Sequence, residues 1–182
     1  MAAVPPLQLL GEWTWMTTTR DGADITVRPM QPSDVERERE FFESLSEDSR
    51  YFRMLTPMKH LPPQLLSEFV NVDYDRRMAL AACVQQEGRE RFVGVARYGP
   101  TDRSEVAELG IAVTDAWQHR GVATLLITAL MRFARVHGFR SFTAVVLPEN
   151  GKMLALARKL EFAVTFDATA HLMHISRDLP AA

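Results

Sequence analysis

The sequence has only one cysteine, Cys83, among its 182 residues. One cysteine can form neither a disulfide within the chain nor the paired thiolates of a structural zinc site, and the five histidines show no spacing typical of metal ligands. No apolar run approaches the roughly 20 residues that span a bilayer. No basic head followed by an apolar stretch marks a secretion signal. We therefore expect a cytoplasmic protein that holds no metal ion and does not bind a membrane.

The sequence also lacks a strong excess of charge of either sign. Its formal net charge of −2 at pH 7 does not indicate a basic nucleic-acid binder. The length suits one domain, and a hydrophobic fraction of 47% is enough for a sizeable core. We predict one domain over 24–178, a partly ordered N-terminal extension over 1–23 that packs on the domain surface, and a tail over 179–182. The sequence leaves the oligomeric state open, a dimer included.

Hydrophobic periodicity predicts an α/β or α+β fold with a mixed sheet. A hairpin turn is expected around Gly88, and Ser33 or Asp34 is expected to cap the first helix. The strand–helix–strand order over 105–147 predicts a right-handed crossover that joins two parallel strands. The expected strands cover 23–29, 78–85, 91–99, 105–113, 141–147, 162–166 and 171–177, and the expected helices cover 34–45, 46–55, 61–72, 121–137 and 150–160.

The stretch DAWQHRGVATLL, residues 115–126, lies between an expected strand and the most regular expected helix. The start of a helix presents unpaired backbone N–H groups and a partial positive charge, which attract an anion. Gly121 and Ala123 leave room for the backbone to approach a phosphate. Arg120 adds a forked cation, and Gln118 adds an amide at the lip. Alternatively, Gly121 only begins a turn and Arg120 is solvated, but the strand before and the helix after favour a diphosphate site.

Residues 106–162 resemble the core of the GNAT superfamily of acyl-CoA-dependent N-acetyltransferases. Gln118, Gly121 and Ala123 match the signature Q/R-x-x-G-x-G/A, and the match extends to Asn150 and the ALARKLEF helix. The resemblance covers about residues 24–178. The segments ITVRPMQPSDVERERE, LSEDSRYFRML and VDYDRRMAL further resemble the bacterial branch that acetylates protein lysines. The resemblance implies a mostly antiparallel sheet with helices on both faces and a V-shaped split between the parallel strands 105–113 and 141–147.

The resemblance also implies acetyl-CoA as the acyl donor and CoA as the product. The backbone of strand 105–113 would hydrogen-bond the pantetheine arm, and the loop before the long helix would wrap the diphosphate. The start of helix 150–160 would line the far side of the thioester. The cofactor-binding residues implied in this way are Ile111, Ala112, Val113, Gln118, His119, Arg120, Gly121, Val122, Ala123, Thr124, Asn150 and Met153.

Glu108 is the candidate catalytic base. A lysine with a pKa of about 10.4 is less than about 0.1% neutral at pH 7, so attack on a thioester gains from a positioned base. Glu108 shares a strand face with the small residues Gly110 and Ala112, and a carboxylate in a central strand is costly unless it faces a wet cleft or a partner. The alternative is a solvated glutamate at the edge of the sheet. The resemblance supports the catalytic role, because the protein-acetylating branch carries a catalytic glutamate at this position.

The acceptor is less clear from the sequence than the donor. We expect a protein lysine, with Tyr51, Asp73, Tyr74 and Asp75 as candidates for the acceptor side, since acidic groups attract a cation. Each of them is equally well explained as a solvated or structural residue. Cys83 could carry an acetyl group covalently, but within LAACV it is expected to be a small core residue.

Two features depart from the superfamily pattern. Helix 150–160 has no tyrosine, which many members use as a general acid for the leaving thiolate, and Glu161 replaces the usual glycine of the closing turn. Because this tyrosine is missing, one alternative function is a non-catalytic regulatory module that binds acyl-CoA. A small-molecule amine acetyltransferase is the other alternative to a protein-lysine acetyltransferase.

Overall fold

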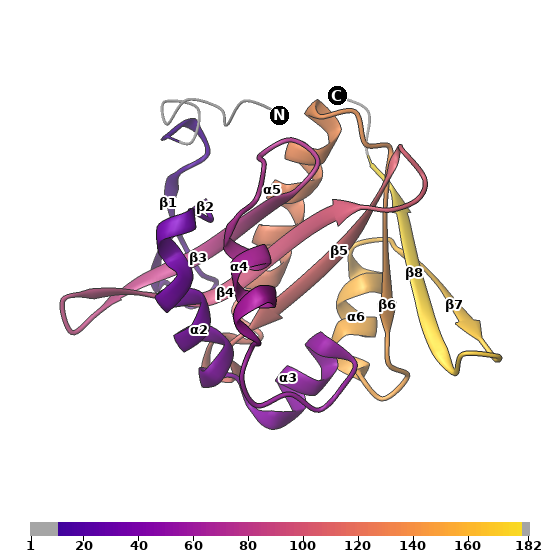
Figure 1. The fold of residues 1–182 in the computed structure, drawn as a ribbon, viewed down its shortest axis with the longest axis horizontal. Helices are drawn as coiled ribbons and strands as arrows, with labels where there is room; N and C mark the ends of the chain where they lie inside the picture. Colours follow the sequence, from indigo (N-terminus) through magenta and orange to yellow (C-terminus); the bar gives the residue numbers. More distant parts are fainter. Residues whose placement is uncertain (1–10, 180–182) are drawn as a thin grey trace.

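The computed structural model describes residues 11–179, so the expectations for 1–10 and 180–182 lie outside the described residues. Eight strands form one sheet in the order β1-β2-β3-β4-β5-β6-β8-β7 (Figure 1). Neighbouring strands are antiparallel except β5 and β6, which run parallel. The predicted mixed and mostly antiparallel sheet is confirmed. The strands are β1 Trp15–Thr18, β2 Asp24–Pro29, β3 Met78–Gln86, β4 Arg89–Pro100, β5 Val106–Val113, β6 Ser141–Val146, β7 Ala163–Asp167 and β8 Leu172–Asp178.

Helices cover both faces of the sheet, as predicted (Figure 1). On one face, α2 and α4 pack in a core cluster that includes Phe42 and Leu66. On the other face, α5 and α6 share a larger cluster that includes Leu126 and Leu154. The helices are α2 Val35–Ser44, α3 Glu47–Met54, α4 Pro63–Val70, α5 Val122–Val136 and α6 Gly151–Lys159, with short 3₁₀ turns η1 Pro32–Asp34 and η2 Asp115–Trp117.

The split of the sheet lies between β5 and β6. The two strands pair only from Val106 with Ser141 to Glu108 with Thr143. Beyond Glu108, β5 continues to Val113 and stays paired with β4 on its other side. The edge of β5 that faces β6 therefore leaves backbone hydrogen-bonding groups without a strand partner over residues 109–113, and these groups need another partner or water. This divergence is the V-shaped split expected from the sequence.

Close packing at Gly94 holds the start of α5 beside the end of β5. A Cβ atom on Gly94 of β4 would lie 2.9 Å from Cγ1 of Val122 and 3.3 Å from Cγ2 of Val113. Because real side-chain atoms do not approach so closely, only glycine allows the helix to sit this near the sheet. The first turn of α5 is thus placed at the open end of the split.

Part of the expected N-terminal extension belongs to the sheet. Strand β1 pairs with β2 from Trp15 opposite Val27 to Thr18 opposite Asp24. The ring of Trp13 packs edge-on against Phe133 of α5, with the ring centroids 4.5 Å apart. Residues 13–18 are therefore tied to both the sheet and the helix that begins at the split.

Candidate functional site

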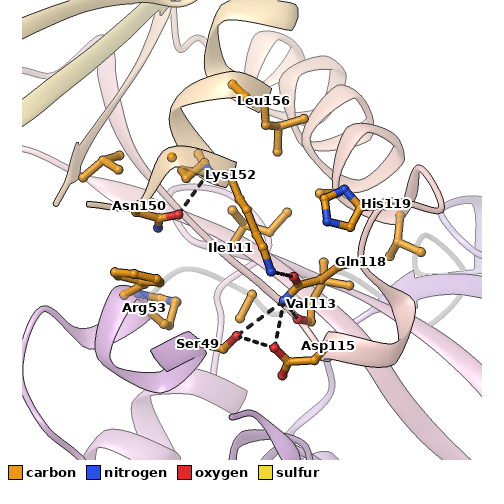
Figure 2. A pocket seen from close by; sticks show the side chains of 18 of the residues that line it. Ser49, Arg53, Ile111, Val113, Asp115, Gln118, His119, Asn150, Lys152 and Leu156 are labelled. Carbon is orange, nitrogen blue, oxygen red and sulfur yellow. Dashed lines mark hydrogen bonds between the residues drawn. The ribbon is translucent and has the colours of Figure 1, made fainter. Parts of the chain in front are cut away.

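A cavity of about 580 Å³ opens where β5 and β6 diverge (Figure 2). Its walls are the second half of β5, the loop and first turn of α5, the end of β6, the start of α6 and helix α3. The volume lies within the roughly 300–1,000 Å³ of small-molecule sites. Three elements that are distant in the sequence, α3, the loop before α5 and α6, meet around this one cavity.

The β5 wall offers backbone groups rather than polar side chains. Ile111, Ala112 and Val113 all line the cavity, as the resemblance implies. The carbonyl of Val113 accepts a hydrogen bond of 3.1 Å from the Gln118 side chain. An extended ligand with amide groups can add to such a strand edge in the way that a further strand would.

The first turn of α5 closes one end of the cavity. Gly121 stands just before the helix with a φ of +92°, in the left-handed region that favours glycine. The first helical hydrogen bond runs from the Leu125 N–H to the Gly121 carbonyl at 3.0 Å, so the preceding N–H groups of the turn have no helical acceptor. His119, Gly121, Val122, Ala123 and Thr124 line the cavity here. A helix start with unpaired N–H groups at a cavity is a geometry that can receive an anion.

The side chain of Arg120 does not take the place that the sequence predicts for it. Its guanidinium forms a 3.1 Å ion pair with Asp21 and lies 4.8 Å from the centroid of the Trp117 ring, and it does not line the cavity. The reason is the β1–β2 turn, which brings Asp21 next to the loop. Arg20 from the same turn lines the cavity beside Gly121 instead. The sequence marks this turn only by Gly22, so Arg20 was not predicted as a site residue.

A polar network joins α3, the loop and α6 across the cavity mouth (Figure 2). The Asp115 carboxylate accepts hydrogen bonds from the Ser46 backbone at 3.0 Å and the Ser49 hydroxyl at 3.2 Å. Burial opposes ionisation of Asp115, but the hydrogen bonds from Ser46 and Ser49 outweigh it and lower its pKa. Gln118 donates to Val113 and accepts a 2.8 Å hydrogen bond from the Lys152 ammonium. The Gln118 amide is therefore engaged by protein groups at both ends.

The start of α6 forms the wall opposite β5. Asn150 caps the helix by accepting a 3.0 Å hydrogen bond from the Met153 N–H. Both residues line the cavity, as the resemblance implies. This hydrogen bond satisfies an N–H group in the first turn of α6. It also holds the Asn150 side-chain amide in one orientation at the cavity wall.

Glu108 lies at the vertex of the split, in the last residue pair that joins β5 to β6. It is exposed, and it is not among the residues that line the cavity. Arg53 of α3 lines the cavity, and its Nη2 is 2.7 Å from the position that a Cβ on Gly110 would occupy. Burial, and then the nearby Arg97, lower the pKa of Arg53 to about 10, while its electrostatic attraction to Glu38 and Glu108 opposes this shift. The vertex thus combines an open carboxylate with a guanidinium that lines the cavity.

The acceptor-side candidates are not gathered at the cavity. Tyr74 is buried, and its hydroxyl donates a 2.8 Å hydrogen bond to the Met30 carbonyl. Asp73 accepts hydrogen bonds from the N–H groups of Asp75 and Arg77 at 3.0 and 2.7 Å, so it shapes the turn before β3. Asp73, Tyr74 and Asp75 do not line the cavity, and the hydrogen bonds of Tyr74 and Asp73 give these two residues a structural role. Tyr51 is exposed on α3 beside the residues of that helix that line the cavity.

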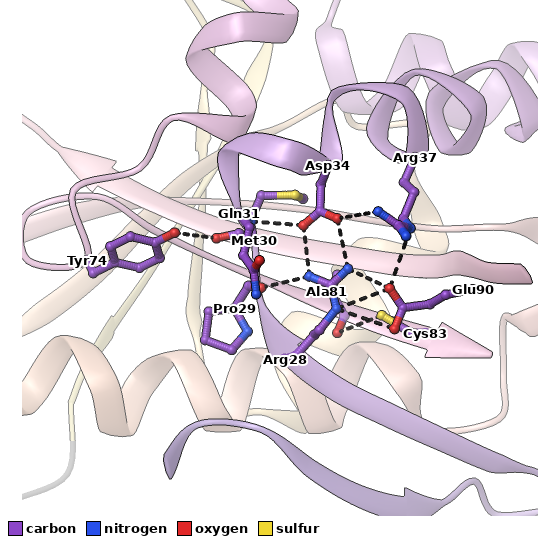
Figure 3. A network of polar contacts seen from close by, with 10 residues as sticks. All are labelled: Arg28, Pro29, Met30, Gln31, Asp34, Arg37, Tyr74, Ala81, Cys83 and Glu90. Carbon is purple, nitrogen blue, oxygen red and sulfur yellow. Dashed lines mark hydrogen bonds and ion pairs between the residues drawn. The ribbon is translucent and has the colours of Figure 1, made fainter. Parts of the chain in front are cut away.

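A second polar cluster lies away from the cavity, between β2, η1 and the β3–β4 hairpin (Figure 3). Arg28 donates two hydrogen bonds of 2.8 Å to Asp34 and one of 2.5 Å to Glu90. The Asp34 carboxylate also accepts from the Gln31 N–H at 2.9 Å. Asp34 precedes α2 as expected for a cap, but its side chain makes no capping bond to that helix because Arg28 and Gln31 occupy it. The cluster is a structural clamp.

Cys83 lies beside this clamp and is expected to be unreactive. The residue is buried, it does not line the cavity, and burial raises the pKa of its thiol to about 12. Because the thiolate is the reactive form, an aromatic disulfide reagent at pH 8 should not label the folded protein. In denaturing urea the same reagent should titrate one thiol per chain. Rapid labelling of the folded protein would contradict the core role of Cys83.

Neither a metal cluster nor a membrane span is found over residues 11–179. No three His, Cys, Asp or Glu side chains in this range are grouped so that they could hold a metal ion. No helix in the same range is long and apolar enough to cross a bilayer.

Known proteins resemble this chain along most of its length. A family model described as an acetyltransferase (GNAT) domain matches residues 24–163. The acetyltransferase PA5475 of Pseudomonas aeruginosa is 34% identical over 148 residues, which cover 81% of this chain and 80% of that protein. The GNAT domain of S. lividans PAT superposes with a TM-score of 0.85 at 31% identity, covering 92% of this chain and 98% of that one. A cAMP-binding acyltransferase from Mycobacterium smegmatis gives a TM-score of 0.65 at 25% identity, and this chain spans 50% of it.

Proposed function

Because the chain belongs to the GNAT acetyltransferase family, we propose that it transfers an acetyl group from acetyl-CoA to a lysine side chain of a protein, with Glu108 as the base. The chain is an acyltransferase by family. The observation that carries the proposal is the split between β5 and β6, where a cavity with an open strand edge and a helix start suited to an anion lies next to the exposed Glu108 carboxylate at the vertex. A cytoplasmic location is part of the proposal, because a chain with one cysteine needs no oxidising compartment.

The cavity fits the parts of acetyl-CoA in order. The open edge of β5 over 109–113 suits the two amides of the pantetheine arm, which need both donors and acceptors. The first turn of α5, with Gly121 in its left-handed conformation, suits the diphosphate. Asn150 and Met153 of α6 line the same cavity, where they can contact the thioester end of the arm. Acetyl-CoA supplies an activated acyl group, and the protein supplies its orientation.

Glu108 is suited to remove a proton from an incoming amine. It is exposed at the vertex, so an acceptor can reach it without entering the walls of the cavity. At pH 7, removing the proton from a lysine with a pKa of about 10.4 costs about 4–5 kcal/mol. A base positioned near the reacting amine offsets part of this cost. Arg53 limits the approach from the α3 side, because its guanidinium occupies the space over Gly110.

The surface of α3 favours a protein as the acceptor. Tyr51 of α3 and Leu55, the residue that follows the helix, are 38% and 39% exposed, and the intervening Phe52 and Arg53 line the cavity. Exposed apolar side chains beside a site provide a contact surface for a protein partner rather than for a small polar amine. Asp48 and Glu149 also line the cavity and attract a cationic lysine.

Acetyl transfer to a defined acceptor tests the proposal. The full chain is incubated with acetyl-CoA and either lysine peptides or a panel of small amines, and CoA thiol release and acceptor mass are measured. An added acetyl group on a peptide ε-amine supports the proposal. Thiol release with small amines alone would indicate the small-molecule enzyme. Acetyl-CoA binding without thiol release would instead indicate a regulatory module.

A further inference from the structure

The turn between β1 and β2, residues 19–23, is tightly closed and lies against the loop before α5. Thr19 is buried, its hydroxyl donates a 2.6 Å hydrogen bond to Asp21, and its backbone N–H donates a 2.9 Å hydrogen bond to the Ala23 carbonyl. The Ala23 N–H donates back to the Thr19 hydroxyl at 3.1 Å. Residues 19–23 therefore satisfy several of their hydrogen-bonding groups within the turn itself.

Two contacts join this turn to the loop. The Arg20 N–H donates a 3.0 Å hydrogen bond to the Arg120 carbonyl, and the Asp21 carboxylate pairs with the Arg120 guanidinium at 3.1 Å. Arg120 in turn lies over the ring of Trp117. The backbone of Arg20 is thus held next to the residue that precedes Gly121, and the Arg120 charge is directed out of the cavity.

The Arg20 side chain extends along the first turn of α5. Its Nε, Cγ and Cδ atoms lie 3.3, 3.4 and 3.6 Å from the position that a Cβ on Gly121 would take. The side chain lines the cavity together with Gly121, Val122 and Ala123. No ion pair joins Arg20 to another residue within the described range 11–179, and Asp21, its nearest acidic neighbour in sequence, is already bound to Thr19 and Arg120. An uncompensated guanidinium therefore stands beside an anion-binding helix start.

We propose that Arg20 of the β1–β2 turn binds the diphosphate of acetyl-CoA, in the place that the sequence predicts for Arg120. The inference rests on the proposed function. A guanidinium presents parallel N–H donors that match phosphate oxygens, and it adds a full charge to the partial charge of the helix start. The acyl-CoA site is then completed by a segment that lies outside the matched GNAT region of 24–163.

The test compares Arg20→Gln with the unchanged protein by calorimetric binding of three ligands. Loss of one charge-assisted contact should weaken acetyl-CoA binding about tenfold or more. Binding of 3′-dephospho-CoA should weaken by the same factor, since it keeps the diphosphate. Binding of acetyl-pantetheine, which has no diphosphate, should not change. Arg20→Lys, which retains the charge but not the fork, should recover part of the loss.

The control is Arg89→Gln, which removes the same charge from an exposed arginine at the start of β4, outside the cavity. It should bind all three ligands as the unchanged protein does. Equal acetyl-CoA binding by the Arg20→Gln variant and the unchanged protein would overturn the inference alone. So would a loss confined to ligands with a 3′-phosphate, or an equal loss with acetyl-pantetheine, which would indicate a structural role. If the unchanged protein binds none of the ligands, the proposed function itself fails.

Discussion

Replacing Glu108 by glutamine is expected to lower kcat for acetyl transfer by roughly 10²–10⁴-fold while the Kd of acetyl-CoA stays near that of the unchanged protein. The amide has nearly the same shape, but it cannot accept a proton at neutral pH. Glu108 is exposed at the vertex of the split and does not line the cavity, so the change should disturb neither the fold nor the donor site. Steady-state kinetics with a lysine peptide, together with calorimetric binding of acetyl-CoA, measure both quantities.

The pH dependence of the same variant separates a lost base from a lost contact. Without a base, the rate follows the fraction of neutral amine, which rises about tenfold per pH unit below the lysine pKa of about 10.4. The loss caused by Glu108→Gln should therefore shrink as the pH is raised. Glu105→Gln is the matched control, because Glu105 is an exposed partner of Arg140 just before β5. A Glu108→Gln variant with normal kcat would show that this carboxylate is not the base.

Replacing Asp34 by alanine is expected to destabilise the fold by about 3–5 kcal/mol, toward the lower end because Glu90 remains bound to Arg28. The Asp34 and Arg28 side chains are only 1% and 12% exposed. Removing the Asp34 carboxylate leaves the Arg28 guanidinium buried with Glu90 as its remaining acidic partner. Since a domain of this size has only about 5–15 kcal/mol of stability, the loss is large. Urea unfolding at pH 7 measures it.

Acid should remove the contribution of Asp34 from the unchanged protein. Burial opposes ionisation of Asp34, but hydrogen bonds from Arg28 and Gln31 outweigh it and hold its pKa below its ordinary value. A lowered pKa in the folded state gives stability that is complete above the unfolded pKa of about 3.9 and is lost as pH falls through the folded value. The difference in free energy of unfolding between the Asp34→Ala variant and the unchanged protein should thus decrease below about pH 4. The control is Glu36→Ala, which removes an exposed ion pair on α2 and should leave the urea midpoint unchanged. If the difference in unfolding free energy between Asp34→Ala and the unchanged protein were the same at all pH values, the proposed role of the Asp34 carboxylate would be contradicted.

The sequence and the structure agree on features that residues close together in the chain determine. Alternating and helical periodicity located the five helices and every described strand except β1, because each buried face repeats with the geometry of its own backbone, whereas β1 fell in the segment predicted as a partly ordered extension. The sequence also predicted a glycine at the start of α5, and the structure adds that Gly121 has a left-handed backbone with a φ of +92°. Asn150 was readable as well, because a cap acts within one turn.

Roles that depend on a partner far away in the chain were not readable. The sequence predicts Arg120 at the phosphate, yet the β1–β2 turn binds its guanidinium and leaves Arg20 in the cavity. It predicts Tyr74 on the acceptor side, yet the buried hydroxyl bonds to Met30. Nothing in the spacing of α3 shows that Arg53 lies over Gly110.

By itself, then, the sequence determined the family fold, the helix start that can receive an anion and the strand that carries Glu108. These features depend on local backbone geometry, which neighbouring residues specify. Only the tertiary structure decided which arginine side chain lines the cavity. A charged side chain pairs with whichever partner the folded chain brings within reach, and the distance between residues far apart in the chain cannot be read from the sequence.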